Sequence, residues 1–213
     1  MESSIFKPSS MDLIRAGLQD LDKARALFDQ LKADDIPDER CAELLSALAH
    51  ACDPDMALSN FVDIVNAMQS SQRDLEHVIP DNDALKRLVT VLGVSDAMGK
   101  LMRFRPDLVQ AAATDHCNSH LYNHDQRRAH VLESVGADPN DRMSPTATMD
   151  LADAATALRR TYRNQLAAII AQDTMSDDPI ALQPRISSEL SDLADAALEG
   201  ALAIARHEIA GSE

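Results

Sequence analysis

The sequence predicts an all-α fold, a compact multi-helix bundle of short helices followed by a long antiparallel helical hairpin. Apolar residues make up 45% of the 213 residues, whereas aromatic residues make up only 3%, and strands draw on aromatic and β-branched side chains. Apolar residues also return every three or four positions along almost the whole chain, with helix-starting and helix-ending residues between the runs. Both patterns favour packed helices over sheets.

Residues 1–113 are predicted to form the bundle. Four helices are expected in its first part, from Ser10 to about Gly17, from Asp20 through Leu31, from Asp38 to Ala51 and from Pro54 through Met68. Ser10 and Asp20 are the expected caps of the first two helices. Asp53 followed by Pro54 is a strong start signal for the fourth, because aspartate offers a capping oxygen and proline lacks only an N–H that would have no partner there.

Three short helices are expected in the second part of the bundle. Asp83 is the expected cap of the first, and Gly93 is expected to end it in the left-handed conformation. Ser95 and Pro106 are expected to start the next two, the last of which ends near Ala113. Helices separated by so few residues must turn sharply on one another, which is typical of a compact bundle or a helical array. We find no fixed repeat period that would indicate a solenoid.

The stretch 114–148 differs from the rest of the chain. It holds four of the seven histidines, few apolar residues and the turn-forming run at residues 136–140. We interpret it as a polar linker or surface excursion, and the pattern allows one short helix at about residues 121–135.

Residues 149–213 are predicted to form the helical hairpin. One long helix is expected from about Met149 to Gln172, and a second from Ser187 to about Ile209. The stretch from Pro179 to Pro184 is expected to separate them. Two long helices joined by a loop bounded by prolines indicate an antiparallel pair.

Three segments resemble the region just ahead of a catalytic core in one bacterial family. They are LVTVLGVSDAMGKLMRFRPDLV at 88–109, LRRTYRNQLAAII at 158–170 and ELSDLADAALEGALAIAR at 189–206. In this order and spacing they are similar to the N-terminal helical region of actinobacterial-type bifunctional glutamine synthetase adenylyltransferase/adenylyl-removing enzymes. The resemblance implies a helical scaffold for a downstream nucleotidyltransferase domain in the control of nitrogen assimilation. It also implies glutamine synthetase as a partner, and ATP and Mg²⁺ as cofactors of a complete parent enzyme.

The catalytic motifs of that family are not among these residues. Family members continue into G-x-G-K-x-G-G-x-E-L and then S-D-x-D, since glycines let backbone N–H groups approach a triphosphate and paired aspartates hold divalent ions. Because residues 1–213 contain neither motif, we expect no catalytic residue, no bound cofactor and no AMP transfer or removal from this chain alone. The alternative reading is a free-standing helical protein-interaction module that grips a partner along its short stacked helices.

Arg159, Arg160 and Arg163 gather positive charge on a predicted helix of an acidic chain. They could reach the phosphates of a nucleotide held by a downstream unit, or they could pair with acids on neighbouring helices. We favour pairing and keep phosphate binding as the alternative.

His116, His120 and His124 follow one another at spacings of four residues. On a helix two neighbours in this series could share a zinc ion, because a step of four residues turns about 400°. Three ligands along a single helix do not converge easily, so a solvated polar segment is the favoured reading.

The composition excludes several classes of partner. The formal net charge of −15 and the pI of about 4.7 argue against nonspecific binding to nucleic acid or to anionic membranes. Three cysteines without a CxxC pair indicate neither a disulfide framework nor a thiolate zinc site. We find no signal peptide at the N-terminus and no apolar window long enough for a membrane span, so a cytoplasmic location is expected.

Overall fold

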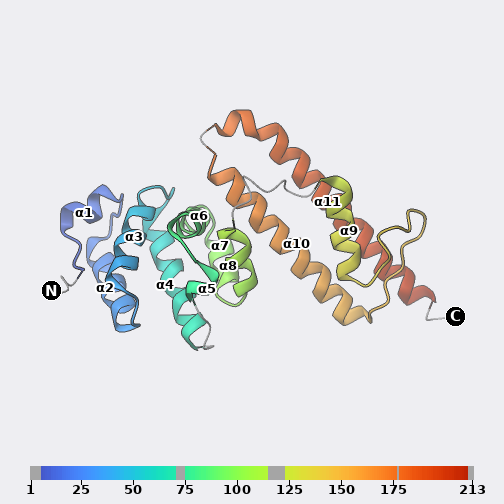
Figure 1. The fold of residues 1–213 in the computed structure, drawn as a ribbon, viewed down its shortest axis with the longest axis horizontal. Coiled ribbons are helices and arrows are strands. Elements are labelled where there is room, and N and C mark those ends of the chain that lie inside the picture. Colours follow the sequence, from blue (N-terminus) through green and yellow to red (C-terminus); the bar gives the residue numbers. More distant parts are fainter. Residues whose placement is uncertain (1–5, 71–74, 115–122, 177, 211–213) are drawn as a thin grey trace. The chain divides into compact units, whose positions relative to one another are not determined.

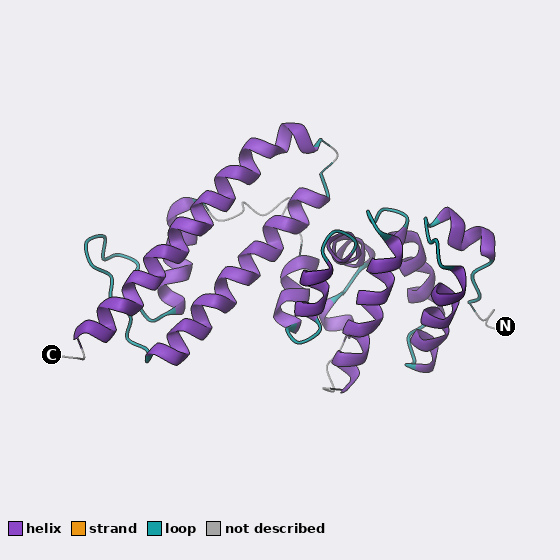
Figure 2. Cartoon of the chain, turned by 180° about the vertical axis from the view of Figure 1, so that it is seen from behind, coloured by secondary structure: helices purple, strands orange, loops and turns teal. Residues whose placement is uncertain are grey.

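The computed structural model describes residues 6–70, 75–114, 123–176 and 178–210, except for the side chains of Glu76 and His77. Within these ranges the elements are all helices, which confirms the predicted fold class (Figure 2). None of these helices is both long and apolar enough to cross a bilayer. The chain divides into two compact units, Met1–Asp115 and His116–Glu213.

The first unit is a bundle of short helices arranged around α6. In chain order the helices are α1 (Ser10–Arg15), α2 (Leu21–Ala33), α3 (Asp38–Leu48), α4 (Pro54–Ser70), α5 (Leu75–Val78), α6 (Asn82–Leu92), α7 (Asp96–Met102) and α8 (Pro106–Ala113). Helix α6 packs against α3, α4, α7 and α8 (Figure 1). Every residue from Leu88 to Leu92 is buried. A helix buried on all sides needs apolar residues around its circumference, and the run LVTVL supplies them.

Four of the predicted helix starts are confirmed. A side-chain oxygen accepts a hydrogen bond from the backbone N–H three residues further on at Asp20 (3.0 Å), Asp53 (2.9 Å) and Ser95 (3.2 Å). Pro106 occupies the first turn of α8, as predicted. These bonds satisfy N–H groups that the helix itself leaves without partners.

The sequence predicts Ser10 as the N-cap of α1, but the structure shows that the N-cap is Ser9. The Oγ of Ser9 accepts from the N–H of Asp12 at 3.2 Å, while the Asp12 carboxylate accepts from the N–H of Ser9 at 3.0 Å. This reciprocal arrangement requires an acid three residues after the cap, and Asp12 stands at that distance only from Ser9. The hydrogen bonds from Ser9 hold the pKa of Asp12 below its usual value.

Two predictions at the ends of α6 are wrong. Asp81, and not Asp83, is the N-cap, because its extended backbone lets its carboxylate accept from the N–H of Ala84 at 2.7 Å. Gly93 has a φ of −84°, so it does not end the helix in the left-handed conformation. Glycine at position 93 instead permits close packing, since a Cβ there would lie 2.9 Å from the Cβ of Ala51.

The second unit contains a long antiparallel pair, α10 (Leu151–Thr174) and α11 (Pro179–Ala210), together with α9 (His124–Ser134), which packs on both (Figure 1). The hairpin was predicted, but the start of its second helix was placed too late. Helix α11 begins at Pro179 and continues through Pro184. The carbonyl of Ile180 loses a helical hydrogen bond to Pro184, and this loss is tolerated because both residues are exposed to water.

The stretch 114–148 is more than the polar linker or surface excursion that its composition suggested. Helix α9 lies within it, and Leu132, Val135, Ala137 and Ala147 form one buried cluster with residues of α10 and α11. The connection after α9 is also held in place by Arg128. Its guanidinium binds both carboxylate oxygens of Glu199 at 2.7 Å and two backbone carbonyls of the connection.

Helix α11 approaches its neighbours most closely at Gly200, and this yields a test. A Cβ at this position would lie 2.8 Å from Val131 and 3.0 Å from Leu158. We expect Gly200→Val to lower the free energy of unfolding of the second unit by about 2 kcal/mol through overpacking. Ala201→Val is the control, because Ala201 is exposed and the change costs only about 0.5 kcal/mol of helix propensity.

Tyrosine fluorescence during denaturant unfolding measures the effect of Gly200→Val. Both tyrosines, Tyr122 and Tyr162, belong to the second unit, and the chain has no tryptophan. Equal losses for Gly200→Val and Ala201→Val would contradict the close approach.

Two cysteines of the first unit have opposite surroundings, which predicts different reactivity. Cys41 is fully buried in α3 and Cys52 is exposed. Burial raises the pKa of the Cys41 thiol, so less of the reactive thiolate forms. In a Cys117→Ser variant we expect a thiol reagent to modify Cys52 at once and Cys41 only after denaturation. Rapid modification of both in the folded protein would show that α3 is not packed as described.

Candidate functional site

The second unit is built around a buried charged cluster, which we call the Arg127 cluster and define as Arg127, Gln165, Arg185 and Glu189. The side chain of Arg127 has no exposed surface, and those of Gln165 and Glu189 are also buried. Arg127 comes from α9, Gln165 from α10 and the other two from α11. Polar side chains from all three helices therefore meet at Arg127.

The contacts of the cluster differ in kind. The Nη1 of Arg127 donates to the Oε1 of Gln165 at 2.7 Å, which is a close hydrogen bond. The Nη2 of Arg127 lies 3.7 Å from the Oε2 of Glu189, an ion pair without a hydrogen bond. The Oε1 of the same carboxylate accepts from the Nε of the half-exposed Arg185 at 3.0 Å. The cluster thus neutralises a buried guanidinium, and its role is to hold three helices together.

Sequence reasoning missed this cluster because Arg127 stands in a segment that is polar in composition. A signal was nevertheless present. Val131 and Val135 follow Arg127 at intervals of four residues, so that all three lie on one helix face. A charged residue that extends an apolar stripe by one turn is a candidate for burial.

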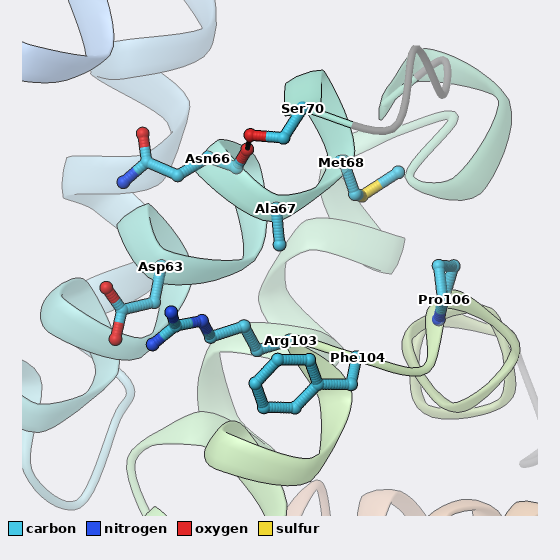
Figure 3. A pocket seen from close by; sticks show the side chains of 8 residues that line it. All are labelled: Asp63, Asn66, Ala67, Met68, Ser70, Arg103, Phe104 and Pro106. Carbon is cyan, nitrogen blue, oxygen red and sulfur yellow. Dashed lines mark hydrogen bonds between the residues drawn. The ribbon is translucent and has the colours of Figure 1, made fainter.

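The first unit carries a surface pocket of about 470 Å³, which we call the Arg103 pocket. Its lining comes from the C-terminal half of α4 and from the connection between α7 and α8, and consists of Asp63, Asn66, Ala67, Met68, Ser70, Arg103, Phe104 and Pro106. Figure 3 shows the Asp63 carboxylate and the Arg103 guanidinium pointing toward each other across it. The Oγ of Ser70 donates to the backbone oxygen of Asn66 at 2.8 Å, a bond within α4.

The Arg103 pocket combines an aromatic wall with both signs of charge. Phe104 is 73% exposed, and the guanidinium carbon of Arg103 lies 5.3 Å from the centre of its ring. Such a cation–π pair presents one flat surface for apolar contact and several N–H donors. Among the described residues that line the pocket Asp63 is the one carboxylate, and this lining suits a side chain of a partner protein better than a triphosphate with two metal ions.

The three arginines singled out from the sequence lie on α10. Arg159 and Arg160 are exposed and Arg163 is half-buried. The Nη2 of Arg159 lies 3.4 Å from the Oγ1 of Thr156, a long hydrogen bond within the helix. Phosphate binding by these residues stays a prediction.

Of the three histidines proposed as metal ligands, only His124 falls in the described residues, and His116 and His120 lie outside them. His124 begins α9, more than half of its side chain is exposed, and its Nδ1 lies 3.9 Å from the Oδ1 of Asp125. Across the described ranges no three histidine, cysteine, aspartate or glutamate side chains come together as a metal-binding group. The histidine metal site stays a prediction.

These observations define the class of the protein as an all-helical protein of two compact units, one built around α6 and one around the Arg127 cluster. The comparisons with known proteins then identify its relatives. The chain is 84% identical over all 213 residues to the bifunctional glutamine synthetase adenylyltransferase/adenylyl-removing enzyme of Bifidobacterium longum (strain DJO10A). It is 31% identical over 201 residues, or 92% of its length, to the enzyme of the same name from Cutibacterium acnes.

The chain is therefore related over its full length to a part of these bifunctional enzymes, which confirms the resemblance inferred from residues 88–206. It spans about a fifth of the length of the curated relatives it matches. No protein-family model matches the chain, and no solved structure matches it.

The Arg127 cluster predicts a pattern of stability changes. Glu189→Leu removes the buried carboxylate that balances Arg127, and we expect it to lower the free energy of unfolding of the second unit by about 3 to 5 kcal/mol. Replacing both charges, in Arg127→Met/Glu189→Leu, is expected to cost much less than the sum of the two single changes, because no buried charge remains.

Denaturant unfolding followed by tyrosine fluorescence checks these values. Arg185→Ala is the control, because Arg185 is half-exposed and its ion pair with Glu189 is worth only about 0 to 1 kcal/mol. Additive losses in the double variant would show that Arg127 and Glu189 do not depend on each other.

Proposed function

We propose that this chain is a noncatalytic helical part of a bifunctional glutamine synthetase adenylyltransferase/adenylyl-removing enzyme, and that it scaffolds a nucleotidyltransferase unit of that enzyme. The observation that carries the proposal is the 84% identity to the Bifidobacterium longum enzyme over the whole chain, which spans 20% of that enzyme. The proposed role is mechanical. Two packed helical units give the nucleotidyltransferase unit a rigid support.

The chemistry of AMP transfer supports a noncatalytic role. Transfer from ATP needs divalent ions held by paired carboxylates, and backbone N–H groups that approach the phosphates closely. Among its described lining residues the Arg103 pocket offers one carboxylate and one guanidinium. In the Arg127 cluster the guanidinium of Arg127 is closed to solvent. In this proposal ATP and Mg²⁺ bind the nucleotidyltransferase unit, and glutamine synthetase is the substrate protein of the whole enzyme.

A free-standing protein-interaction module is the second candidate function. The Arg103 pocket favours it, because Phe104 exposes most of its ring beside a cation on a short turn between helices. Exposed aromatic and arginine side chains of this kind are common at the centres of protein interfaces. Binding of glutamine synthetase to the isolated chain, abolished by Phe104→Ala, would support this second function.

Activity assays test the proposed function. The purified 213-residue chain, given ATP, Mg²⁺ and unmodified glutamine synthetase, is expected to transfer no AMP above the rate without protein. With adenylylated glutamine synthetase and phosphate it is expected to remove none. The full-length Bifidobacterium longum enzyme is the positive control for both assays, and incorporation of AMP by the isolated chain would overturn the noncatalytic role.

The scaffolding role needs the whole enzyme. In a chimera, this chain replaces the matching fifth of the Bifidobacterium longum enzyme, and we expect both activities to be retained. Deletion of the same fifth is expected to lower them and to lower the temperature at which the remaining enzyme unfolds. Full activity and unchanged stability after the deletion would contradict a supporting role.

A further inference from the structure

Helix α11 carries a second apolar face in addition to the one that it buries. We call this face the α11 stripe, and it consists of Leu190, Ala194, Leu198, Ala201, Leu202, Ala205 and Ile209. All seven residues are exposed, and the larger ones strongly so, with Leu198 at 65%, Leu202 at 54% and Ile209 at 66%. Exposed leucines are unremarkable singly, but a continuous row of them marks an interaction surface.

The spacing of the stripe places it on one side of the helix. Apart from the adjacent pair Ala201 and Leu202, its residues follow one another at intervals of three and four, so they share a face about five turns long. The buried side of α11, which includes Leu193, Gly200 and Ala203, packs on α9 and α10 and faces nearly the opposite way. The stripe is therefore not needed for the packing of the second unit.

The seven stripe residues are all apolar, and the exposed Ser191 and Glu208 lie on the same side of the helix. The alanines of the stripe leave shallow notches between the leucines and the isoleucine. A second helix can approach closely at such notches and seat its own larger side chains there. The stripe thus has the form of one half of a helix–helix interface.

We propose that the α11 stripe docks against an apolar face of the remaining polypeptide of the parent enzyme. This inference rests on the proposed function, and it adds the surface through which the support is given. The curated relatives are about five times as long as this chain, so four-fifths of their length is available to supply the facing element. A face in the same polypeptide is present at a high effective concentration, which makes such docking favourable without a large interface.

Charge distinguishes this occupant from a second copy of the chain. Each copy carries a net charge of −15, so two copies repel each other at close range. The exposed Asp195 lies one turn before Leu198 and adds negative charge beside the stripe. In this proposal the facing element is apolar, and a basic side chain at its edge would be attracted to Asp195.

Cysteine labelling tests the docking. In a Cys52→Ser/Cys117→Ser background, Leu202→Cys places a thiol on the stripe and Met143→Cys places one on an exposed loop. In the isolated chain both are expected to react rapidly with a maleimide. In the chimera with the Bifidobacterium longum enzyme, Leu202→Cys is expected to react at least about tenfold more slowly, because its exposure requires local opening. Met143→Cys is the control and is expected to keep its rate.

Two further variants keep the test decisive. Ala201→Cys makes a smaller change on the same stripe and is expected to be protected in the same way. Leu198→Glu/Leu202→Glu is expected to leave the unfolding of the isolated chain unchanged, since both residues are exposed, and to lower the unfolding temperature of the chimera.

The possible outcomes separate this inference from the proposed function. Equal labelling of the stripe in the isolated chain and in an active chimera would overturn the docking and leave the scaffolding role standing. A protected stripe in a folded chimera that transfers no AMP would support the docking and count against that role. Concentration-dependent dimerisation of the isolated chain, abolished by Leu198→Glu/Leu202→Glu, would assign the stripe to a second copy and overturn the inference.

Discussion

The second unit depends on the burial of one positive charge. Arg127 has no exposed surface, and the cost of removing a guanidinium from water is recovered only when oppositely charged and polar groups surround it. Its partners Gln165 and Glu189 come from two other helices, which makes the requirement a constraint on assembly. A shift of α11 by one turn relative to α9 would move the carboxylate of Glu189 away from Arg127. The cluster therefore selects one register of α9, α10 and α11.

On either side of the Arg127 cluster, apolar packing need not specify the register of the helices. One buried cluster, with Leu132, Ala154 and Ile204 among its members, lies toward one end of the hairpin, and another, formed by Ile169, Ile186 and Leu193, lies toward the other. Alanine and leucine contacts of this kind stabilise many helix registers almost equally well. Apolar burial thus supplies most of the stability, and the Arg127 cluster adds a geometric requirement that apolar contacts alone do not impose.

Local chemistry was predictable from the sequence, and long-range packing was not. Caps such as Asp20 and Ser95 were found because a cap needs only one oxygen three residues before an N–H. The role of Gly93 was predicted wrongly because its small size makes room for Ala51, which is far away in the sequence, and does not determine how its own helix ends. The burial of Arg127 was missed for the same reason, since its hydrogen-bond partner Gln165 lies 38 positions further along the chain and its charge partner Glu189 lies further still. The Arg103 pocket likewise forms between α4 and the turn after α7, and no local sequence pattern predicts that these two segments lie together.

Helix α11 shows most clearly why periodicity alone cannot assign an interior. Its buried face mixes the small residues Ala196, Gly200 and Ala203 with the larger Ile186, Leu193 and Ile204, and its exposed face likewise mixes leucines with alanines in the α11 stripe. Small residues let the three helices approach closely, as at Gly200, where a Cβ would lie 2.8 Å from Val131. Two apolar faces on one helix weaken the usual contrast between an inner and an outer side. One apolar face is packed within this unit, where Gly200 permits close contact, and the other is exposed and suited to a further packing layer.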